Sequence, residues 1–134
     1  MRVGILGTGG IAHVLADTFS QMEEVECYAV ASRTLEKAEK FCEETEFKQA
    51  YGSYLELVED PKVELVYIAT PHSNHYDAMK LCINNKKPVL CEKAFTLNAK
   101  QAREIVDLAK EKQVYVAEAI WTRYMPSRQM INEL

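Results

Sequence analysis

Short hydrophobic runs alternate along the chain with longer stretches in which apolar residues recur at helical spacing. Such runs are typical of parallel strands covered on both faces, where apolar side chains need not alternate with polar ones. The sequence predicts strands at residues 2–6, 27–31, 65–69, 89–91 and 114–117. A weaker candidate covers residues 48–51 and ends at Gly52.

Amphipathic helices are predicted between these strands. Thr34 and Asn98 are suited to be N-caps, and a helix in the fourth stretch should stop before Pro88. The predicted buried faces comprise Ile11, Leu15 and Phe19; Ala38, Phe41 and Cys42; His75, Met79, Cys82 and Ile83; and Ala102, Ile105, Val106 and Ala109. Strand–helix–strand repetition of this kind predicts an α/β fold with a doubly wound parallel sheet, a Rossmann-type domain.

Composition narrows the class of protein. The 134 residues are 48% hydrophobic and 27% charged, which is typical of one globular domain. The net charge is −4 and the two signs are interleaved, so no basic face for nucleic acid is predicted. No apolar run approaches the ~20 residues of a membrane span. Without an apolar leader after Met1, a cytoplasmic protein is expected.

The four cysteines form no C-x-x-C pair, so neither a metal site nor a redox dithiol is predicted. Cys27, Cys82 and Cys91 lie among apolar neighbours. Free cysteine in such surroundings behaves as a small buried hydrophobe, and this is the interpretation we favour.

The first strand leads directly into a G-x-G-x-x-A pattern formed by Gly7, Thr8, Gly9, Gly10, Ile11 and Ala12. Gly7 would allow a tight turn, Gly9 would let a pyrophosphate approach the backbone, and Ala12 would let the helix pack close to the strand. The helix start offers unsatisfied N–H groups to an anion. The pattern predicts dinucleotide binding, whereas His13 is interpreted as a surface or packing residue.

The residues after the second strand indicate which dinucleotide is preferred. NAD-specific domains carry an acid there, but this chain has Ser32, Arg33 and Thr34, followed by Lys37. Hydroxyls and a guanidinium suit the extra 2′-phosphate of NADP. The sequence therefore predicts NADP, with NAD as the alternative if Arg33 is only a solvated cation.

Polar residues follow three further strands, at the edge of the sheet where ligands of this fold bind. The three segments are Thr70-Pro71-His72-Ser73-Asn74-His75, Glu92-Lys93-Ala94-Phe95 and the run from Glu118 to Pro126. Together with the glycine turn, the T-P-x-x-x-H and E-K motifs resemble the glucose–fructose oxidoreductase and inositol dehydrogenase family. The last run, E-A-I-W-T-R-Y-M-P, resembles its dimeric trans-dihydrodiol dehydrogenase branch.

The resemblance, which covers essentially the whole chain, implies a role for each matching position. Cofactor contacts are implied for Thr70, Pro71, His72, His75, Glu92 and Lys93. Trp121 and Arg123 would line the cofactor or substrate side of the cleft, with core packing as the alternative for Trp121. Thr70, Pro71 and His75 would lie along the nicotinamide and its ribose. Lys93 would be catalytic, because a cation beside the reacting oxygen stabilises alkoxide character; an ordinary surface lysine is the alternative. The family usually has proline where this chain has Ala94, which leaves the local backbone geometry open.

The resemblance also implies an enzyme that transfers hydride between NADP and a sugar, polyol or diol. Residues 1–122 would form the dinucleotide-binding domain, and residues 123–134 would begin the connection to a substrate domain that this chain lacks. The chain alone should then be inactive; a dinucleotide-binding sensor or regulatory domain without turnover is the alternative. Met130, Ile131 and Leu134 should form an apolar stripe on a terminal helix, through which the chain would form a homo-oligomer.

Overall fold

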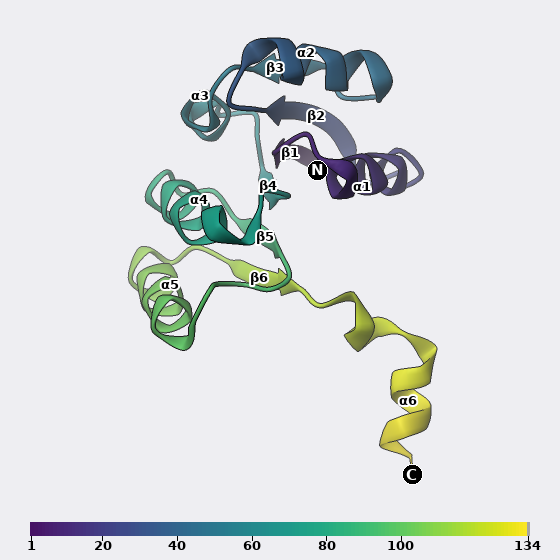
Figure 1. The fold of residues 1–134 in the computed structure, drawn as a ribbon, viewed down its shortest axis with the longest axis vertical. Helices are drawn as coiled ribbons and strands as arrows, with labels where there is room; N and C mark the ends of the chain where they lie inside the picture. Colours follow the sequence, from purple (N-terminus) through teal and green to yellow (C-terminus); the bar gives the residue numbers. More distant parts are fainter. Residues whose placement is uncertain (134) are drawn as a thin grey trace.

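The computed structural model describes residues 1–133, and its elements follow the predicted alternation of strand and helix (Figure 1). In chain order they are β1 (Arg2–Leu6), α1 (Gly10–Ser20), β2 (Glu26–Ala31), α2 (Leu35–Glu44), β3 (Gln49–Tyr51), α3 (Tyr54–Glu59), β4 (Leu65–Ile68), α4 (His72–Asn84), β5 (Val89–Glu92), α5 (Ala99–Lys112), β6 (Val116–Ala119), the 3-10 helix η1 (Trp121–Tyr124) and α6 (Pro126–Asn132). No helix among the described residues is long and apolar enough to cross a membrane.

The strands form one sheet in the order β3-β2-β1-β4-β5-β6, with every pair of neighbours parallel. Helices α1 and α2 contribute to the core on one face, and α3, α4 and α5 contribute to the core on the other. This confirms the predicted doubly wound α/β fold. Because all strands are parallel, their carboxyl ends share one edge of the sheet, and a ligand of this fold is expected there.

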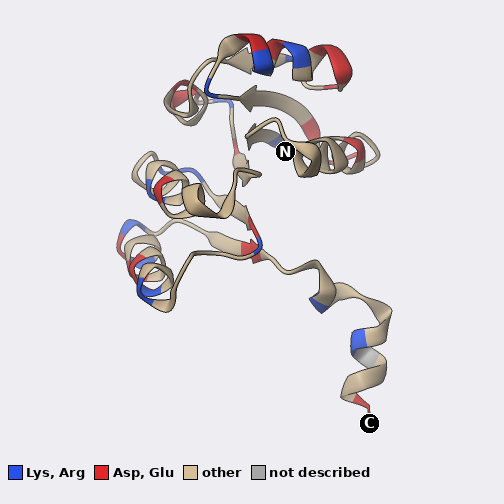
Figure 2. Ribbon diagram, viewed as in Figure 1, with Lys and Arg blue, Asp and Glu red and all other residues tan. Residues whose placement is uncertain are grey.

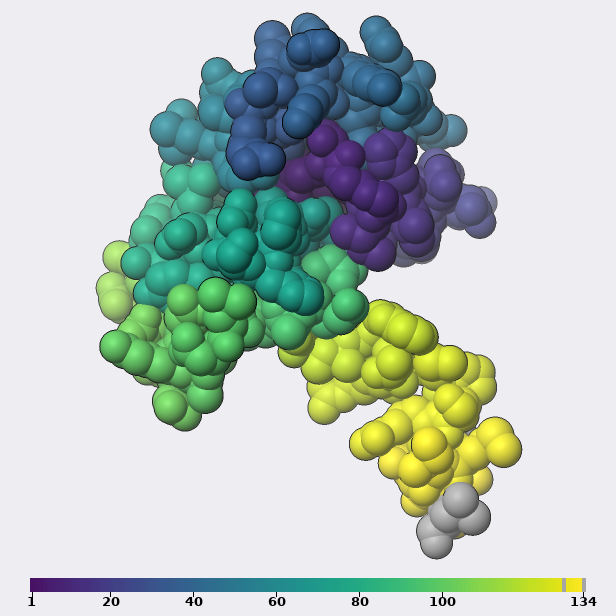
Figure 3. Space-filling model, viewed as in Figure 1, coloured from purple at the N-terminus to yellow at the C-terminus, as the bar shows by residue number. Residues whose placement is uncertain are grey.

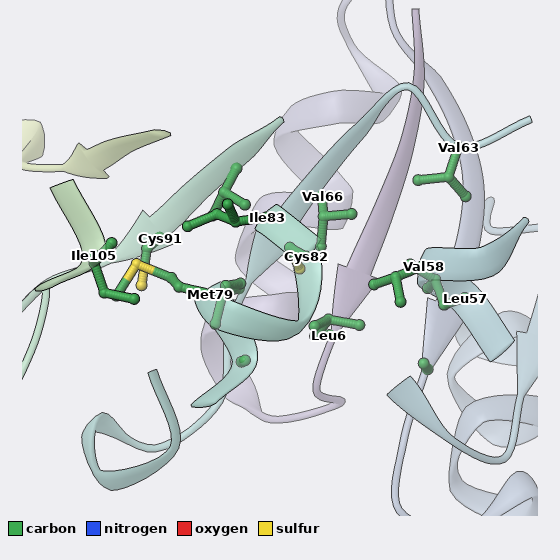
Figure 4. Close-up of a cluster of buried hydrophobic side chains, with 14 of the residues drawn as sticks. Leu6, Leu57, Val58, Val63, Val66, Met79, Cys82, Ile83, Cys91 and Ile105 are labelled. Atoms are coloured by element: carbon green, nitrogen blue, oxygen red, sulfur yellow. The ribbon is translucent and has the colours of Figure 1, made fainter. Parts of the chain in front are cut away.

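Two hydrophobic clusters lie on the two faces of the sheet. Figure 4 shows part of the larger one, where Met79 and Cys82 of α4 lie near Cys91 of β5. All three are 0% exposed, as are Val66 and Ile68 in the middle of the sheet. Cys27 is also buried, in the other cluster, so the prediction for the three apolar cysteines is confirmed.

Of the two predicted N-cap residues, one forms the expected capping hydrogen bond and the other does not. The side chain of Asn98 accepts a hydrogen bond from the Gln101 amide and caps α5 as predicted. Thr34 occupies the N-cap position of α2, but its side chain makes no capping hydrogen bond.

The end of α5 explains why the last strand begins later than predicted, at Val116 instead of residue 114. Gln113 has left-handed backbone (φ 54°), and the Val114 amide donates to the Ala109 carbonyl oxygen at 2.9 Å. This pair of features is a Schellman motif, which satisfies the last carbonyls of a helix. Val114 is therefore used to close the helix and cannot begin the strand.

Two residues predicted to be buried lie on the surface. Ile11 is 41% exposed and Val106 is 42% exposed. In α1 the buried stripe is instead Ala12, Ala16 and Phe19. The small side chain of Ala12 faces the sheet, as the glycine-turn pattern predicts, and this rotates Ile11 outward.

The segment after β6 extends away from the rest of the molecule, as the yellow end of the chain shows in Figure 3. Proline opens α6 as expected, at Pro126. Met130 and Ile131 of the predicted apolar stripe are 68% and 61% exposed, and the third member, Leu134, lies outside the described residues.

Candidate functional site

A cavity of about 730 Å³ opens at the carboxyl edge of the sheet, beside the ends of β1, β2 and β4. Its lining includes many residues selected from the sequence: Gly7, Thr8, Gly9, Ser32, Arg33, Lys37, Thr70 and Pro71. It also includes His13, Lys40, Phe41, Glu44, Tyr54, Ala69, Ser73 and Asn74. Three strand ends that are far apart in sequence therefore meet in one concave site.

The glycine turn forms the floor of this cavity. Gly7 has a φ of +104°, and a Cβ at this position would lie 2.8 Å from the Ala69 carbonyl oxygen. Gly9, the N-cap of α1, has no atom within 4 Å of where its Cβ would be. Gly7 is therefore required by the fold, whereas the absence of a side chain at Gly9 keeps open a space that a ligand can occupy.

The remaining pattern residues have other positions. Gly10 begins α1 but does not line the cavity, and neither do the exposed Ile11 or the fully buried Ala12. His13, interpreted from the sequence as a surface or packing residue, does line it. Its Nδ1 lies 3.1 Å from the Gly9 carbonyl oxygen. The only signal for this contact was its place one turn into the helix after the glycines.

Exposed cations gather at the end of the cavity formed by α2 and the loop before it. Ser32 is buried beneath them, and Arg33 and Lys37 are exposed. Lys40 joins them, with its Nζ 3.8 Å from Glu44. Both signs of charge are visible along α2 in Figure 2.

Helical spacing could have predicted two of the residues that the sequence analysis missed. Lys40 follows Lys37 by three positions and Glu44 follows Lys40 by four, so these residues share a face of α2. The carboxylate of Glu44 also lies 3.1 Å from His13 Nε2, which joins α1 to α2 across the cavity. Thr34 does not line the cavity, since it occupies the N-cap position of α2 instead.

Thr70 lines the cavity and carries a buried side-chain oxygen. The residue is 6% exposed, and its Oγ1 has no hydrogen-bond partner among the described residues. A buried hydroxyl without a partner costs free energy, so a ligand that supplies one is favoured. Thr70 lines the same cavity as the open space at Gly9 and the cation Arg33, and this combination suits a phosphorylated dinucleotide.

The two histidines of α4 hold the backbone that follows β5. His72 Nε2 lies 2.7 Å from the Lys93 carbonyl oxygen. His75 is 0% exposed, and its ring nitrogens lie 2.8 Å from the Ala94 carbonyl oxygen and 2.9 Å from that of Thr70. His75 is therefore fully buried, and its ring lies between the backbone that follows β4 and the backbone that follows β5.

Glu92 and Lys93 differ sharply in exposure. Glu92 is 8% exposed, and its carboxylate accepts hydrogen bonds from the Tyr67 hydroxyl and, at 3.1 Å, from the Lys93 amide. Lys93 is exposed, and the peptide bond to Ala94 is cis. Within the described part of the chain, the Lys93 ammonium has no hydrogen-bond or ion-pair partner, so it can meet a ligand.

Trp121 and Arg123 lie in η1, beyond β6, and do not line the cavity. Trp121 is 60% exposed and Arg123 is exposed as well. Neither is brought together with the strand-end residues in this structure.

Comparisons with known proteins agree with this arrangement. Residues 1–120 match the model of the GFO/IDH/MocA oxidoreductase family, NAD-binding Rossmann fold. The whole chain is 41% identical to trans-1,2-dihydrobenzene-1,2-diol dehydrogenase of Mus musculus, of which it covers 41%. It is 43% identical to D-xylose 1-dehydrogenase (NADP(+)) of Hypocrea jecorina, of which it covers 37%. The chain thus spans about two fifths of these curated relatives.

Solved structures show the same likeness. A 3-ketoreductase from Actinomadura kijaniata, in complex with NADP and TDP-benzene, superposes with a TM-score of 0.93 at 25% identity. That superposition covers 99% of this chain and 41% of the reductase. The resemblance drawn from the sequence motifs is therefore confirmed at the level of the family.

Proposed function

The chain belongs to the GFO/IDH/MocA family of NAD(P)-dependent oxidoreductases and corresponds to the NAD-binding Rossmann domain of that family, and we propose that it binds NADP in preference to NAD. We further propose that it serves hydride transfer to or from a sugar, polyol or diol. The observation that carries the proposal is the single cavity that joins the glycine turn, Arg33 and Thr70. Relatives of this chain are dehydrogenases of a dihydrodiol and of xylose.

Each part of the cavity suits one part of the cofactor. The start of α1 beside Gly9 would receive the pyrophosphate, since helix N–H groups and the helix dipole favour an anion there. Arg33, with Ser32 and Lys37, would hold the 2′-phosphate by charge-assisted hydrogen bonds. The Thr70 hydroxyl would bind the nicotinamide half, which gives that orphaned group a partner.

Lys93 would act at the reacting oxygen of the substrate. When bound, the nicotinamide supplies the acceptor or donor of hydride. An ammonium beside the substrate oxygen stabilises the negative charge that develops as the C–H bond breaks or forms. Glu92 beside it would contact the nicotinamide end, and His72 and His75 would keep the backbone of residues 93–94 in place.

The preference for NADP is tested by calorimetric titration with NADPH and NADH. We expect tighter binding of NADPH, and Arg33→Ala should weaken NADPH binding by about tenfold to a hundredfold, since one hydrogen bond to a charged group contributes roughly 1.5–3 kcal/mol. NADH binding should change little. Arg103→Ala, on the surface of α5, is the matched control. Equal affinities for the two dinucleotides in the unmodified chain would contradict the proposal.

We also propose that residues 1–122 act as the dinucleotide-binding unit and that residues from 123 onward supply a contact surface for another polypeptide segment or a second copy. Tyr124, Met130 and Ile131 are each more than 60% exposed. Exposed apolar side chains close together mark interaction sites. Light scattering should show self-association of the chain, and Met130→Ser with Ile131→Ser should reduce it. A strictly monomeric chain would count against homo-oligomerisation.

A further inference from the structure

Tyr67 is a polar residue in the middle of a buried strand. It lies on β4 opposite Leu90 of β5, and it is 1% exposed. Its ring packs edge-on against Phe19 of α1, with ring centroids 6.0 Å apart. A buried tyrosine hydroxyl needs a hydrogen-bond partner. The identity of that partner therefore indicates what the Tyr67 hydroxyl does.

The partner is the carboxylate of Glu92, the last residue of β5. The hydroxyl of Tyr67 donates to Oε1, and the amide of Lys93 donates to Oε2 at 3.1 Å. Each oxygen of this carboxylate is therefore held from a different direction. Burial, reinforced by the bond to Glu92, raises the pKa of Tyr67, so its hydroxyl keeps its proton and remains a donor.

We infer that Tyr67 is a positioning residue for the turn formed by residues 92–94. Its hydroxyl fixes the carboxylate of Glu92, and through that carboxylate it fixes the backbone that carries Lys93. The inference rests on the proposed function, in which Glu92 meets the nicotinamide end of the cofactor. Tyr67 touches no ligand itself. It lies behind Glu92, on the face of the sheet covered by α1.

Loss of the Tyr67 hydroxyl has a specific physical consequence. In Tyr67→Phe the ring and its packing against Phe19 remain, but Oε1 of Glu92 becomes a buried acceptor without this donor. Leaving a charged group so placed is costly, and the side chain rotates to regain solvent. The hydrogen bond to the Lys93 amide is then lost as well, and the turn is no longer fixed before a ligand arrives.

The first test compares two ligands that differ in whether they reach Glu92. NADP⁺ carries the nicotinamide, whereas 2′,5′-ADP fills only the end of the cavity near Arg33. We expect Tyr67→Phe to weaken NADP⁺ binding about tenfold and to change 2′,5′-ADP binding less than twofold, by calorimetry. Tyr51→Phe is the matched control, because it removes another tyrosine–carboxylate bond, to Asp60 at 2.8 Å, and neither residue lines the cavity.

The second test needs no ligand. Hydrogen exchange of the Lys93 amide, measured by NMR, should be about tenfold faster in Tyr67→Phe and unchanged in Tyr51→Phe. A merely structural role would speed exchange throughout the sheet. In addition, Glu92→Ala, which removes the acceptor, should remove the effect: Tyr67→Phe with Glu92→Ala should bind NADP⁺ no more weakly than Glu92→Ala alone.

The outcomes separate this inference from the function on which it rests. Equal weakening of both ligands by Tyr67→Phe, or unchanged exchange of the Lys93 amide, would overturn the positioning role. If 2′,5′-ADP and NADP⁺ both fail to bind the unmodified chain, the proposed function is wrong. The amide exchange then still decides whether Tyr67 holds the turn.

Discussion

The carboxyl edge of the sheet has two ends that are built differently. At the glycine end, formed by Gly7, Gly9, Arg33 and Lys37, open backbone and exposed cations face the cavity. At the lysine end, residues 92–94 are held by Tyr67, His72 and His75 through hydrogen bonds, of which the one from Tyr67 is buried and the one from His75 is partly buried. The exposed side chain of Lys93 is free of hydrogen bonds within the described part of the chain and can meet a ligand there.

Under the proposed function the two ends would have different tasks, which accounts for the difference. Binding a phosphate requires charge and N–H groups that can remain in water until the ligand arrives, because phosphates are themselves strongly solvated. Placing one ammonium beside a reacting oxygen requires geometry fixed in advance, since small displacements cost large factors in rate. Under the proposed function, exposed charge would therefore serve affinity at one end, and a preformed set of hydrogen bonds would serve precision at the other.

The largest expected contrast between the ends is in cysteine reactivity. Cys91 precedes Glu92 at the lysine end, and burial, with Glu118 and Glu92 nearby, raises the pKa of its thiol to about 12. At pH 8 an ordinary thiol of pKa 9.0 has about a thousand times more thiolate, the reactive form. Cys42 on α2 has a pKa raised by partial burial but remains half-buried instead of fully buried.

Iodoacetamide labelling followed by mass spectrometry should therefore modify Cys42 first and Cys91 at least a hundredfold more slowly. Because the pKa of Cys91 is raised, its labelling rate should climb about tenfold per pH unit up to pH 10 and beyond. The unfolded chain in urea is the control, where the rates should converge. Comparable labelling of both cysteines in the native chain would show that the lysine end is not rigid.

The next contrast concerns turnover. In a protein with the dehydrogenase activity of the proposed function, Lys93→Met should lower kcat by at least about a hundredfold, a typical loss when one group that stabilises developing charge is removed. The Kd for NADPH should change less than threefold, because under the proposed function the glycine end would supply most of the binding. Stopped-flow kinetics and calorimetry measure the two quantities. Turnover within a few-fold of the parent would make Lys93 an ordinary surface residue.

Substitutions of two glycines should separate effects on stability from effects on cofactor binding within the glycine end. Gly7→Ala puts a Cβ 2.8 Å from the Ala69 carbonyl oxygen at a φ of +104°, so the free energy of unfolding should fall by about 1–3 kcal/mol or more. Gly9→Ala meets no atom within 4 Å and should cost about 1 kcal/mol or less. It should weaken NADPH binding about tenfold, because its methyl group enters the space for the pyrophosphate.

Urea titrations and calorimetry on both variants decide the point. If Gly9→Ala binds NADPH as well as the parent chain does, the pyrophosphate lies elsewhere. If Gly7→Ala is as stable as the parent, the turn does not require its left-handed backbone.

The glycine end could be predicted from the sequence because each pattern that indicates it lies within a few consecutive residues. The G-x-G-x-x-A turn and the absence of an acid between residues 31 and 35 need no knowledge of distant contacts. The lysine end could be predicted only in part, since the residues that hold it by hydrogen bonds come from β4 and α4. Nothing near Tyr67 in the sequence indicates Glu92, and the burial of His75 follows only once α4 is packed against the backbone after β5.

The smallest expected effect, a salt dependence, tests whether exposed charge dominates the glycine end. Raising NaCl from 50 to 500 mM shortens the Debye length from above 10 Å to about 4 Å, which screens the pairing of Arg33 and Lys37 with a 2′-phosphate. NADPH binding should weaken several-fold more than NADH binding, because only NADPH carries that phosphate. In Arg33→Ala the two salt dependences should come closer together, whereas in Tyr67→Phe their difference should persist, since Glu92 lies at the other end. Calorimetric titrations at four salt concentrations measure the slopes. If NADPH and NADH binding in the parent chain had the same dependence on salt, Arg33 and Lys37 would remain in solvent when NADPH is bound. The contrast between the two ends would then rest on the hydrogen bonds of the lysine end alone.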